Sequence, residues 1–372
     1  LAPLFVQVVR LAMAMNLVKL GRLAIDGTRL QAHTSQHRRM KYEKMQKAID
    51  QIEQELAELR SKIEAENEVE ATATECTLPE QIQQREARLE SIKRAKATIE
   101  IEAMNRKKPI SINTSKSFND LDACFMNSKK GFLVGYNGQI VTDGHSQIVV
   151  AAEVYQNTND APLLEDMLEQ SKDVCGREGE SVLADSGYLS AANIAAVEAR
   201  GSAPIFAAKK EQGCAGQGDS DETKYEQVTA DPLTNAYQCL AGKTLPYKSR
   251  RREDGIFVAL PTDFCDGCAF QSRCRLYPQR HQKRIGLALP KDWMTLRRHY
   301  QRSRQETFRD EYKMRKAIVE PVFGNIKWNK SLRIGVTGIR RVSNWWKLVC
   351  TAHNIEKIVR HLASPRLQAT IS

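Results

Sequence analysis

The chain has 372 residues and a formal net charge of +11, with a sequence pI of about 9.2. A hydrophobic content of 41% supports a buried core, and charges interrupt every apolar run before it reaches the ~18 residues of a membrane span. The excess of lysine and arginine favours a polyanionic partner, of which nucleic acid is the commonest.

The first 21 residues predict an amphipathic helix. Leu4, Val8, Leu11 and Met15 recur along it at helical spacing. The chain opens inside this pattern and without an initiator Met. We therefore expect residues 1–21 to be the remnant of a longer N-terminal helical domain.

Short strands and helices alternate in the segments that follow. A strand is expected at residues 22–26, ending in Asp26, and Gly27 and Thr28 either turn the chain or continue the strand. Further strands are expected at 132–142, 147–154, 181–185 and 204–207, with helices at 161–171 and 190–200. Asp143-Gly144 predicts a hairpin turn, and Ser190 is the expected N-cap of the last helix.

Residues 41–104 break this alternation and predict a helical hairpin. Their first apolar residues recur four and three positions apart, which is a heptad seam: Met45, Ile49, Ile52, Leu56, Leu59 and Ile63. A second stripe is formed by Ile82, Leu89, Ile92 and Ile99. The two helices could bury these stripes against each other and project as an arm, or pack on the main body.

Without the helical insertion, the order is strand, strand, strand, helix, strand, helix, strand. This is the order of a ribonuclease-H-like α/β fold, a mixed sheet flanked by helices. We expect an N-terminal remnant (1–21), a ribonuclease-H-like core (22–36 and 107–207), an inserted helical hairpin (37–106), a cysteine-rich insertion that would bind zinc (208–280), and a C-terminal basic helical region that completes the core (281–372).

Three acids are candidates for a metal centre. Asp26 and Asp185 each end a short apolar strand, where active sites gather in open α/β sheets. Glu320 lies in a helical pattern with Tyr312 and Lys316 one turn apart, and Lys327 falls close to the same stripe. Three carboxylates suit two Mg²⁺ ions acting on a phosphodiester. For the segment around Glu320, the alternative is an exposed helix held by salt bridges, with no catalytic role. Pro321 should kink that helix just after Glu320.

The cysteine-rich insertion contains a CxxC pair. Cys265 and Cys268 form it, with Cys274 six positions later and Cys239 upstream. Four thiolates match the tetrahedral coordination of Zn²⁺, although simple reduced thiols remain the alternative.

The basic C-terminal region carries three tryptophans. Trp328, Trp345 and Trp346 could stack on nucleic-acid bases, but packing in a core is the expected role.

Several stretches, taken in order, resemble bacterial insertion-sequence transposases of the DDE class. They are Ala24–Thr28, Gly135–Gln139, Leu183–Tyr188, Val319–Lys327 and the C-terminal Ala352-His353-Asn354. Each motif is weak by itself, but their succession is specific and covers nearly the whole chain.

The resemblance implies a DNA transposase whose metal-binding catalytic residues are Asp26, Asp185 and Glu320. It also implies DNA contacts by Tyr312, by Arg315 or Lys316, and by Lys327. Two Mg²⁺ ions, a homodimer on transposon ends and target DNA, and a place in the bacterial cytoplasm at the nucleoid are expected with it. An inactive DNA-binding remnant of a transposase is the alternative, because the chain opens inside a helix.

Overall fold

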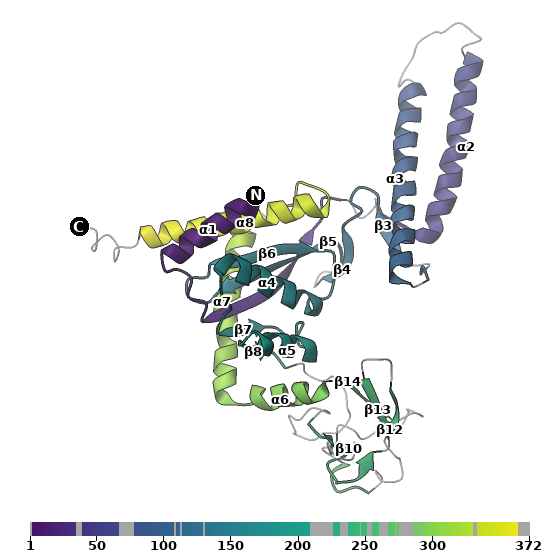
Figure 1. The fold of residues 1–372 in the computed structure, drawn as a ribbon. Coiled ribbons are helices and arrows are strands. Elements are labelled where there is room, and N and C mark those ends of the chain that lie inside the picture. The colour runs from purple at the N-terminus through teal and green to yellow at the C-terminus, as the bar shows by residue number, and fades with distance from the viewer. Residues whose placement is uncertain are drawn as a thin grey trace.

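The computed structural model shows a central α/β body from which a helical arm and a small β-rich segment extend (Figure 1). It describes residues 2–34, 39–66, 78–107, 109–111, 114–128, 131–208, 226–230, 237–245, 247–250, 255–259, 267–271, 274, 286–290, 292–329 and 333–363.

A mixed sheet forms the centre of the body, and β1 is its middle strand. On one side β5 pairs antiparallel with β1, and β4 and β6 pair antiparallel with β5; on the other side β7 and β8 continue in parallel. The strands are β1 (Arg22–Gln31), β4 (Cys124–Ser128), β5 (Gly131–Asp143), β6 (Val149–Tyr155), β7 (Ser181–Ala184) and β8 (Ala203–Phe206). The order β6-β5-β1-β7-β8 confirms the predicted ribonuclease-H-like α/β fold.

β1 runs past Asp26 to Gln31, and its two edges pair over different lengths. The parallel ladder with β7 ends at Ala24, whereas the antiparallel ladder with β5 runs on to Gln31. Gly27 and Thr28 therefore continue the strand. Asp26 lies inside β1, where β1 is still paired with β5 but no longer with β7.

Local signals in the sequence explain several boundaries. Gly144 follows β5 in the predicted turn, and its amide donates to Arg22 O at 2.8 Å, which ties the turn to the start of β1. Ser190 caps the next helix as predicted, because its side chain accepts a hydrogen bond from Asn193 N at 3.1 Å.

Helices cover the sheet. They are α1 (Ala2–Ala14), α4 (Leu164–Cys175), α5 (Ala191–Ala199), α6 (Trp293–Ser303), α7 (Glu306–Asn329) and α8 (Ile339–Leu362), with the short helix η2 (Ala161–Leu163) before α4. α4 and α8 pack against β6, α1 packs against α8, and α7 contacts β1, β5, β7 and β8. The C-terminal helices thus join the sheet formed by earlier parts of the chain.

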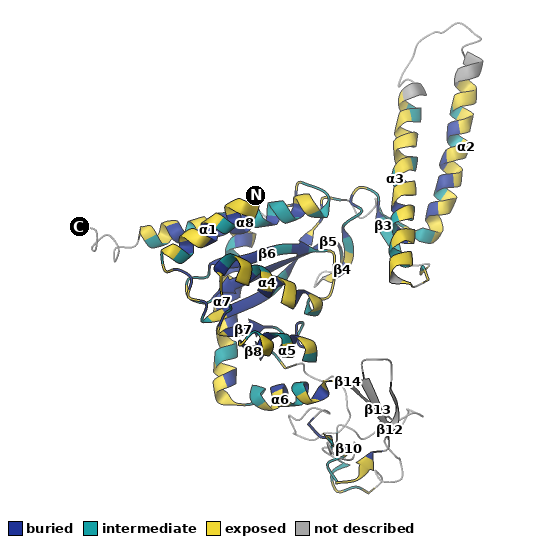
Figure 2. Ribbon diagram, in the orientation of Figure 1, coloured by how far each residue is buried: buried dark blue, intermediate teal, exposed yellow. Residues whose placement is uncertain are grey.

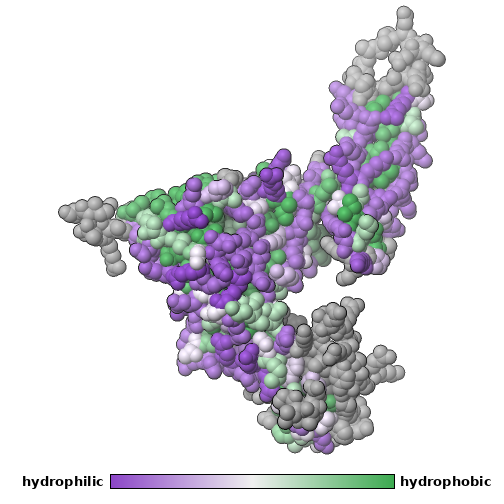
Figure 3. Space-filling model, viewed as in Figure 1, coloured by the Kyte–Doolittle hydropathy of each residue, from purple (hydrophilic) through white to green (hydrophobic). Residues whose placement is uncertain are grey.

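The predicted N-terminal helix is confirmed, but its buried face differs from the predicted stripe. α1 buries Phe5, Val8, Val9 and Ala12 against the body. Leu4 and Leu11 are exposed, and they contribute to the hydrophobic surface that Figure 3 shows along α1 and α8. Two faces of this helix are apolar. The spacing of the apolar residues therefore did not identify which face packs against the body.

The two predicted long helices form the arm, α2 (Tyr42–Glu66) and α3 (Leu78–Arg106). They bury their stripes against each other in a core separate from that of the body: Met45, Ile49, Ile52, Leu56, Ile92, Ala95 and Ile99. Figure 2 shows this buried seam between exposed outer faces. A two-stranded sheet, β2 (Arg39–Lys41) and β3 (Ser115–Ser117), forms the base of the arm.

Two small sheets follow the body in sequence and lie at its lower end in Figure 1. Neither was predicted. Their strands are β9 (Thr229–Ala230), β10 (Tyr237–Gln238), β11 (Thr244–Leu245), β12 (Tyr247–Arg250), β13 (Gly255–Ala259) and β14 (Gly286–Pro290).

No helix in the described part of the chain is long and apolar enough to cross a membrane.

Candidate active site

Asp26 and Asp185 are neighbours because β1 and β7 run in parallel. Ala24 and Leu183 are the last pair of that ladder, and each aspartate follows two residues later on its own chain segment. Asp26 Oδ1 accepts a hydrogen bond from Gly27 N at 2.8 Å, and Asp185 Oδ1 accepts one from Gly187 N at 2.7 Å. These backbone bonds orient both carboxylates at the predicted edge of the sheet.

A third aspartate, Asp160, belongs to the same cluster. It lies in the loop before η2, and its Oδ1 accepts hydrogen bonds from Asn137 Nδ2 at 2.6 Å and Gln139 Nε2 at 3.0 Å. Sequence reasoning missed Asp160, which lies in a loop and in no recognised motif. The side-chain amides of Asn137 and Gln139 on β5 indicate that a polar partner lies nearby, because both are fully buried and buried amides need hydrogen-bond partners.

Gln139 connects this cluster to the β7 side of the site. It lies opposite Gly27 in the ladder, and a Cβ at Gly27 would come within 2.3 Å of Gln139 Nε2. Tyr188 donates its hydroxyl hydrogen to Gln139 Oε1, so the amide is held from both ends. The close packing explains why glycine follows Asp26.

Arg315 on α7 neutralises part of this negative charge. Its Nη2 lies 2.8 Å from Asp26 Oδ2, and the two side chains are 9% and 21% exposed. Tyr312, one turn earlier, hydrogen-bonds with Arg315, and burial raises the pKa of this tyrosine. Of the two basic residues that the sequence could not separate, Arg315 therefore faces the aspartates, while Lys316 is exposed.

The pKa of Asp26 is raised from 3.8 to about 6, chiefly by burial. Arg315 and the Gly27 amide oppose the rise, and the nearby charges of Asp185 and Asp160 add to it. Arg29 Nη1 lies 3.6 Å from Asp160 Oδ1, so two cations, Arg315 and Arg29, face three carboxylates. A bound cation would favour the ionised form of Asp26.

Glu320 lies on the same helix as Arg315, α7. It lies five residues after Arg315, which places it about 140° around an ideal helix, and it is exposed like Lys316 and Lys327. No three His, Cys, Asp or Glu residues in the described ranges gather closely enough to hold a metal ion together. The structure brings together Asp26, Asp185 and Arg315, and the place of Glu320 in the metal centre stays a prediction.

Pro321 does not end α7, which runs without interruption to Asn329. Because proline lacks an N–H, the carbonyl of Ala317 one turn earlier loses its helical partner. Gln147 Nε2 donates to Ala317 O at 2.8 Å and supplies the missing bond. The helix is thereby tied to the turn between β5 and β6.

The predicted zinc ligands are only partly described. Cys239, Cys268 and Cys274 are half-buried, and Cys265 lies outside the described residues. The zinc site therefore stays a prediction.

The core role expected for all three tryptophans is wrong for Trp328. Its side chain, near the end of α7, is 90% exposed, whereas Trp346 is fully buried and donates to Gln139 O at 3.0 Å. Trp345 is half-buried and packs against the core. Trp328 lies on the exposed side of a helix end, which spacing did not reveal.

Comparison with known proteins gives one finding. The family model described as a transposase DDE domain matches residues 115–355, roughly two thirds of the chain. The match includes Asp160, Asp185 and Glu320. Asp26 precedes the matched residues, and the two arm helices lie between Asp26 and the match in the sequence. Searches among curated proteins and solved structures gave no significant match. The chain belongs to the family of transposases that carry a DDE domain.

Proposed function

We propose that this protein cleaves DNA and transfers the freed strand in a metal-dependent reaction centred on Asp26 and Asp185. The observation that carries the proposal is the pairing of these acids beside Asp160, with the pKa of Asp26 raised to about 6. Burial and neighbouring acids disfavour the charge of Asp26, and Arg315 compensates for only part of that cost. A cation bound at this centre would offset the remainder.

The residues present suit Mg²⁺. Carboxylate oxygens are the hard ligands that it prefers, and Asp26 and Asp185 would provide them, since both are partly accessible. When bound, the metal would activate the attacking hydroxyl and stabilise the leaving oxygen of a phosphodiester.

The chain's own groups would position the DNA around this centre. The guanidinium of Arg315 lies beside Asp26, where it can donate to the oxygens of a phosphate. Buried Gln139 and Tyr188 and the half-buried Asp160 form a hydrogen-bonded network beside Gly27, the residue that follows Asp26. Lys316, Lys327 and Tyr312 remain candidates for contacts with the DNA along α7.

Glu320 is the third metal ligand that the resemblance implies. It is exposed on α7, the helix that also carries Arg315 beside Asp26. We keep Glu320 in the proposed triad, with Asp160 as the acid that already lies beside the pair.

The reaction has two steps. In the first, water attacks a phosphodiester at the end of the mobile element and leaves a 3′-hydroxyl and a 5′-phosphate. In the second, that 3′-hydroxyl attacks a phosphodiester of target DNA, forms the new bond and releases a different 3′-hydroxyl. The resemblance supports a bacterial insertion sequence as the element and a homodimer as the form that joins two ends.

A second candidate function is that of an inactive DNA-binding protein. The ion pair between Arg315 and Asp26 and the exposure of Glu320 favour it.

Nicking of supercoiled DNA separates the two candidates. The wild-type protein should nick in Mg²⁺ and stop when EDTA is added, and Asp26→Asn and Asp185→Asn should each lose the activity. Asp173→Asn, on the exposed face of α4, is the matched control and should keep it. A wild-type protein that binds DNA without nicking it would establish the inactive form.

A further inference from the structure

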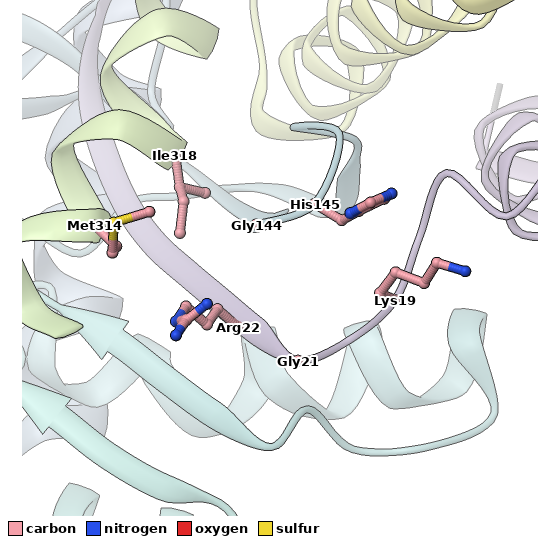
Figure 4. Close-up of a pocket in the computed structure, with 7 residues that line it drawn as sticks. All are labelled: Lys19, Gly21, Arg22, Gly144, His145, Met314 and Ile318. Carbon is pink, nitrogen blue, oxygen red and sulfur yellow. The ribbon is translucent and has the colours of Figure 1, made fainter.

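A cavity of about 240 Å³ lies at the start of β1, away from the aspartates. Three segments that are distant in sequence line it (Figure 4): Lys19, Gly21, Arg22, Gly144, His145, Met314 and Ile318. Gly21 and Gly144 face each other across the opening, with Arg22 and the α7 residues on one side and Lys19 and His145 on the other. None of the functional residues discussed above belongs to this lining.

The buried carboxylate of Asp143 holds the basic walls in place. Its side chain is fully buried, and it accepts hydrogen bonds from Lys19 N at 3.1 Å, Leu20 N at 3.3 Å and His145 N at 3.3 Å. Leu20 adopts a positive φ of 56°, a conformation that costs a residue with a side chain about 1–2 kcal/mol. Asp143 thus joins the turn after β5 to the segment before β1 through hydrogen bonds to both.

Four basic residues, Lys19, Arg22, Arg177 and Lys357, lie in or beside the cavity. Lys19, Arg22 and His145 line it, and Arg177 Nη2 donates to Lys19 O at 2.7 Å. Lys357 reaches the same turn through Gln147 Oε1 at 2.6 Å.

Besides the buried Asp143, two further acids lie close by. Glu311 is 3.7 Å from Arg22 Nε in a half-exposed ion pair, and Glu180 lies behind Gly21. Exposed pairs of this kind are weak, so an incoming anion can compete for Arg22.

Small residues keep the floor of the cavity open. A Cβ at Gly144 would lie 3.0 Å from Ile318 Cδ1 and 3.1 Å from Arg22 Cβ, so a side chain there would crowd the space. A water takes roughly 30 Å³ in the liquid, so the cavity has room for a phosphate group with several of its waters.

The cavity faces the same side of β1 as the aspartate. Side chains alternate along a strand, so Arg22, Ala24 and Asp26 share one face. Four residues of strand span about 13 Å, close to the rise of four base pairs at roughly 3.4 Å each. A duplex whose scissile phosphate lay at Asp26 would carry another backbone phosphate within reach of Arg22.

We propose that this cavity binds a phosphodiester of the DNA backbone, a few nucleotides from the bond that is cut. The inference rests on the proposed function, because it takes DNA to be the substrate. Arg22, Lys19 and His145 would donate to the phosphate oxygens, and Asp143 would fix the backbone that carries Lys19 and His145. The contact reads no base, so it fixes where the DNA lies and not which sequence is chosen.

The test is the salt dependence of binding to a duplex of arbitrary sequence. Each phosphate contact adds about 0.9 to the slope of log affinity against log salt concentration. A Lys19→Gln, Arg22→Gln double variant should lower the slope by about one, and bind about eightfold more weakly at about 0.1 M salt than the wild-type protein, with the difference vanishing towards about 1 M.

Three further variants separate this effect from a general loss of charge or fold. Lys93→Gln with Lys172→Gln removes the same charge from α3 and α4, and should leave the slope unchanged. Glu311→Gln frees Arg22 from its acid and should tighten binding, by up to about fivefold. The charge-preserving Lys19→Arg, Arg22→Lys variant should keep the wild-type slope.

Different results overturn different claims. If the wild-type protein binds duplex DNA with a steep slope and the double variant does the same, the cavity is not a phosphate site. If inorganic phosphate binds wild-type protein and not the double variant, while both bind DNA equally, it is a site for the free anion and the inference is again wrong. If the wild-type protein does not bind DNA at all, the proposed function fails first.

Discussion

Replacing Asp26 by Asn removes a charge from the site and keeps the shape of the side chain. The pKa of Asp26 is about 6 in the folded protein against an ordinary value of 3.8, so folding disfavours its ionised form. At about 1.4 kcal/mol per pH unit, this difference corresponds to about 3 kcal/mol. We therefore expect Asp26→Asn to stabilise the metal-free protein by about 3 kcal/mol at neutral pH.

The stabilisation should depend on pH in a defined direction. The folded state holds the Asp26 proton more tightly than the unfolded chain, so wild-type stability falls as the pH rises from 3.8 to about 6. Above that window the full cost is present. Below it both states are protonated, and the advantage of Asn should shrink to well under about 1 kcal/mol at about pH 4.

Thermal unfolding in EDTA, followed by circular dichroism at several pH values, measures this difference. Asp173→Asn, an exposed aspartate on α4, serves as the control and should show no pH-dependent gain. If Asp26→Asn is no more stable than wild-type protein at about pH 7.5, or keeps its advantage at about pH 4, then burial and neighbouring acids do not disfavour the Asp26 charge.

Three further predictions concern stability. Tyr188→Phe should cost about 1–3 kcal/mol in thermal unfolding, because it leaves buried Gln139 Oε1 without its donor; no loss would show that the bond contributes little. Gly135→Ala should cost about 3 kcal/mol or more, because its Cβ would lie 2.0 Å from Leu30 O, and a stable variant would contradict that contact. Trp328→Ala should change stability by no more than about 0.5 kcal/mol, since the side chain is 90% exposed, and a larger loss would restore the core role.

Much of the fold could be predicted because its signals are local. Ser190 caps its helix, Asp143-Gly144 makes the turn, and the heptad stripe from Met45 onward packs as its spacing indicates. Each depends on residues within a few positions of one another. The order of strands then indicated the ribonuclease-H-like sheet.

The remainder depends on partners that are distant in sequence. Asp26 lies within a strand and not at its end, because β5 pairs further along β1 than β7 does. Asp160 joins the site only through the amides of β5. Neither fact is visible until the register of the sheet is known.

Helix rotation was the other source of error. One residue turns a helix by about 100°, so spacing could not decide whether Arg315 or Lys316 faces the aspartates. The packing of α7 decides it for Arg315. Glu320, whose place in the site stays a prediction, is exposed on the same helix.

Cleavage of the protein backbone by bound iron tests the proposed metal centre most directly. Fe²⁺ binds the oxygen sites that Mg²⁺ uses, and with ascorbate and peroxide it cuts the chain next to the metal. We expect cuts near Asp26 and Asp185, and near Glu320 once DNA is bound, all suppressed by excess Mg²⁺. Cuts near Asp160 in place of Glu320 would replace the third ligand, and an absence of cuts at both Asp26 and Asp185 would contradict the metal centre itself.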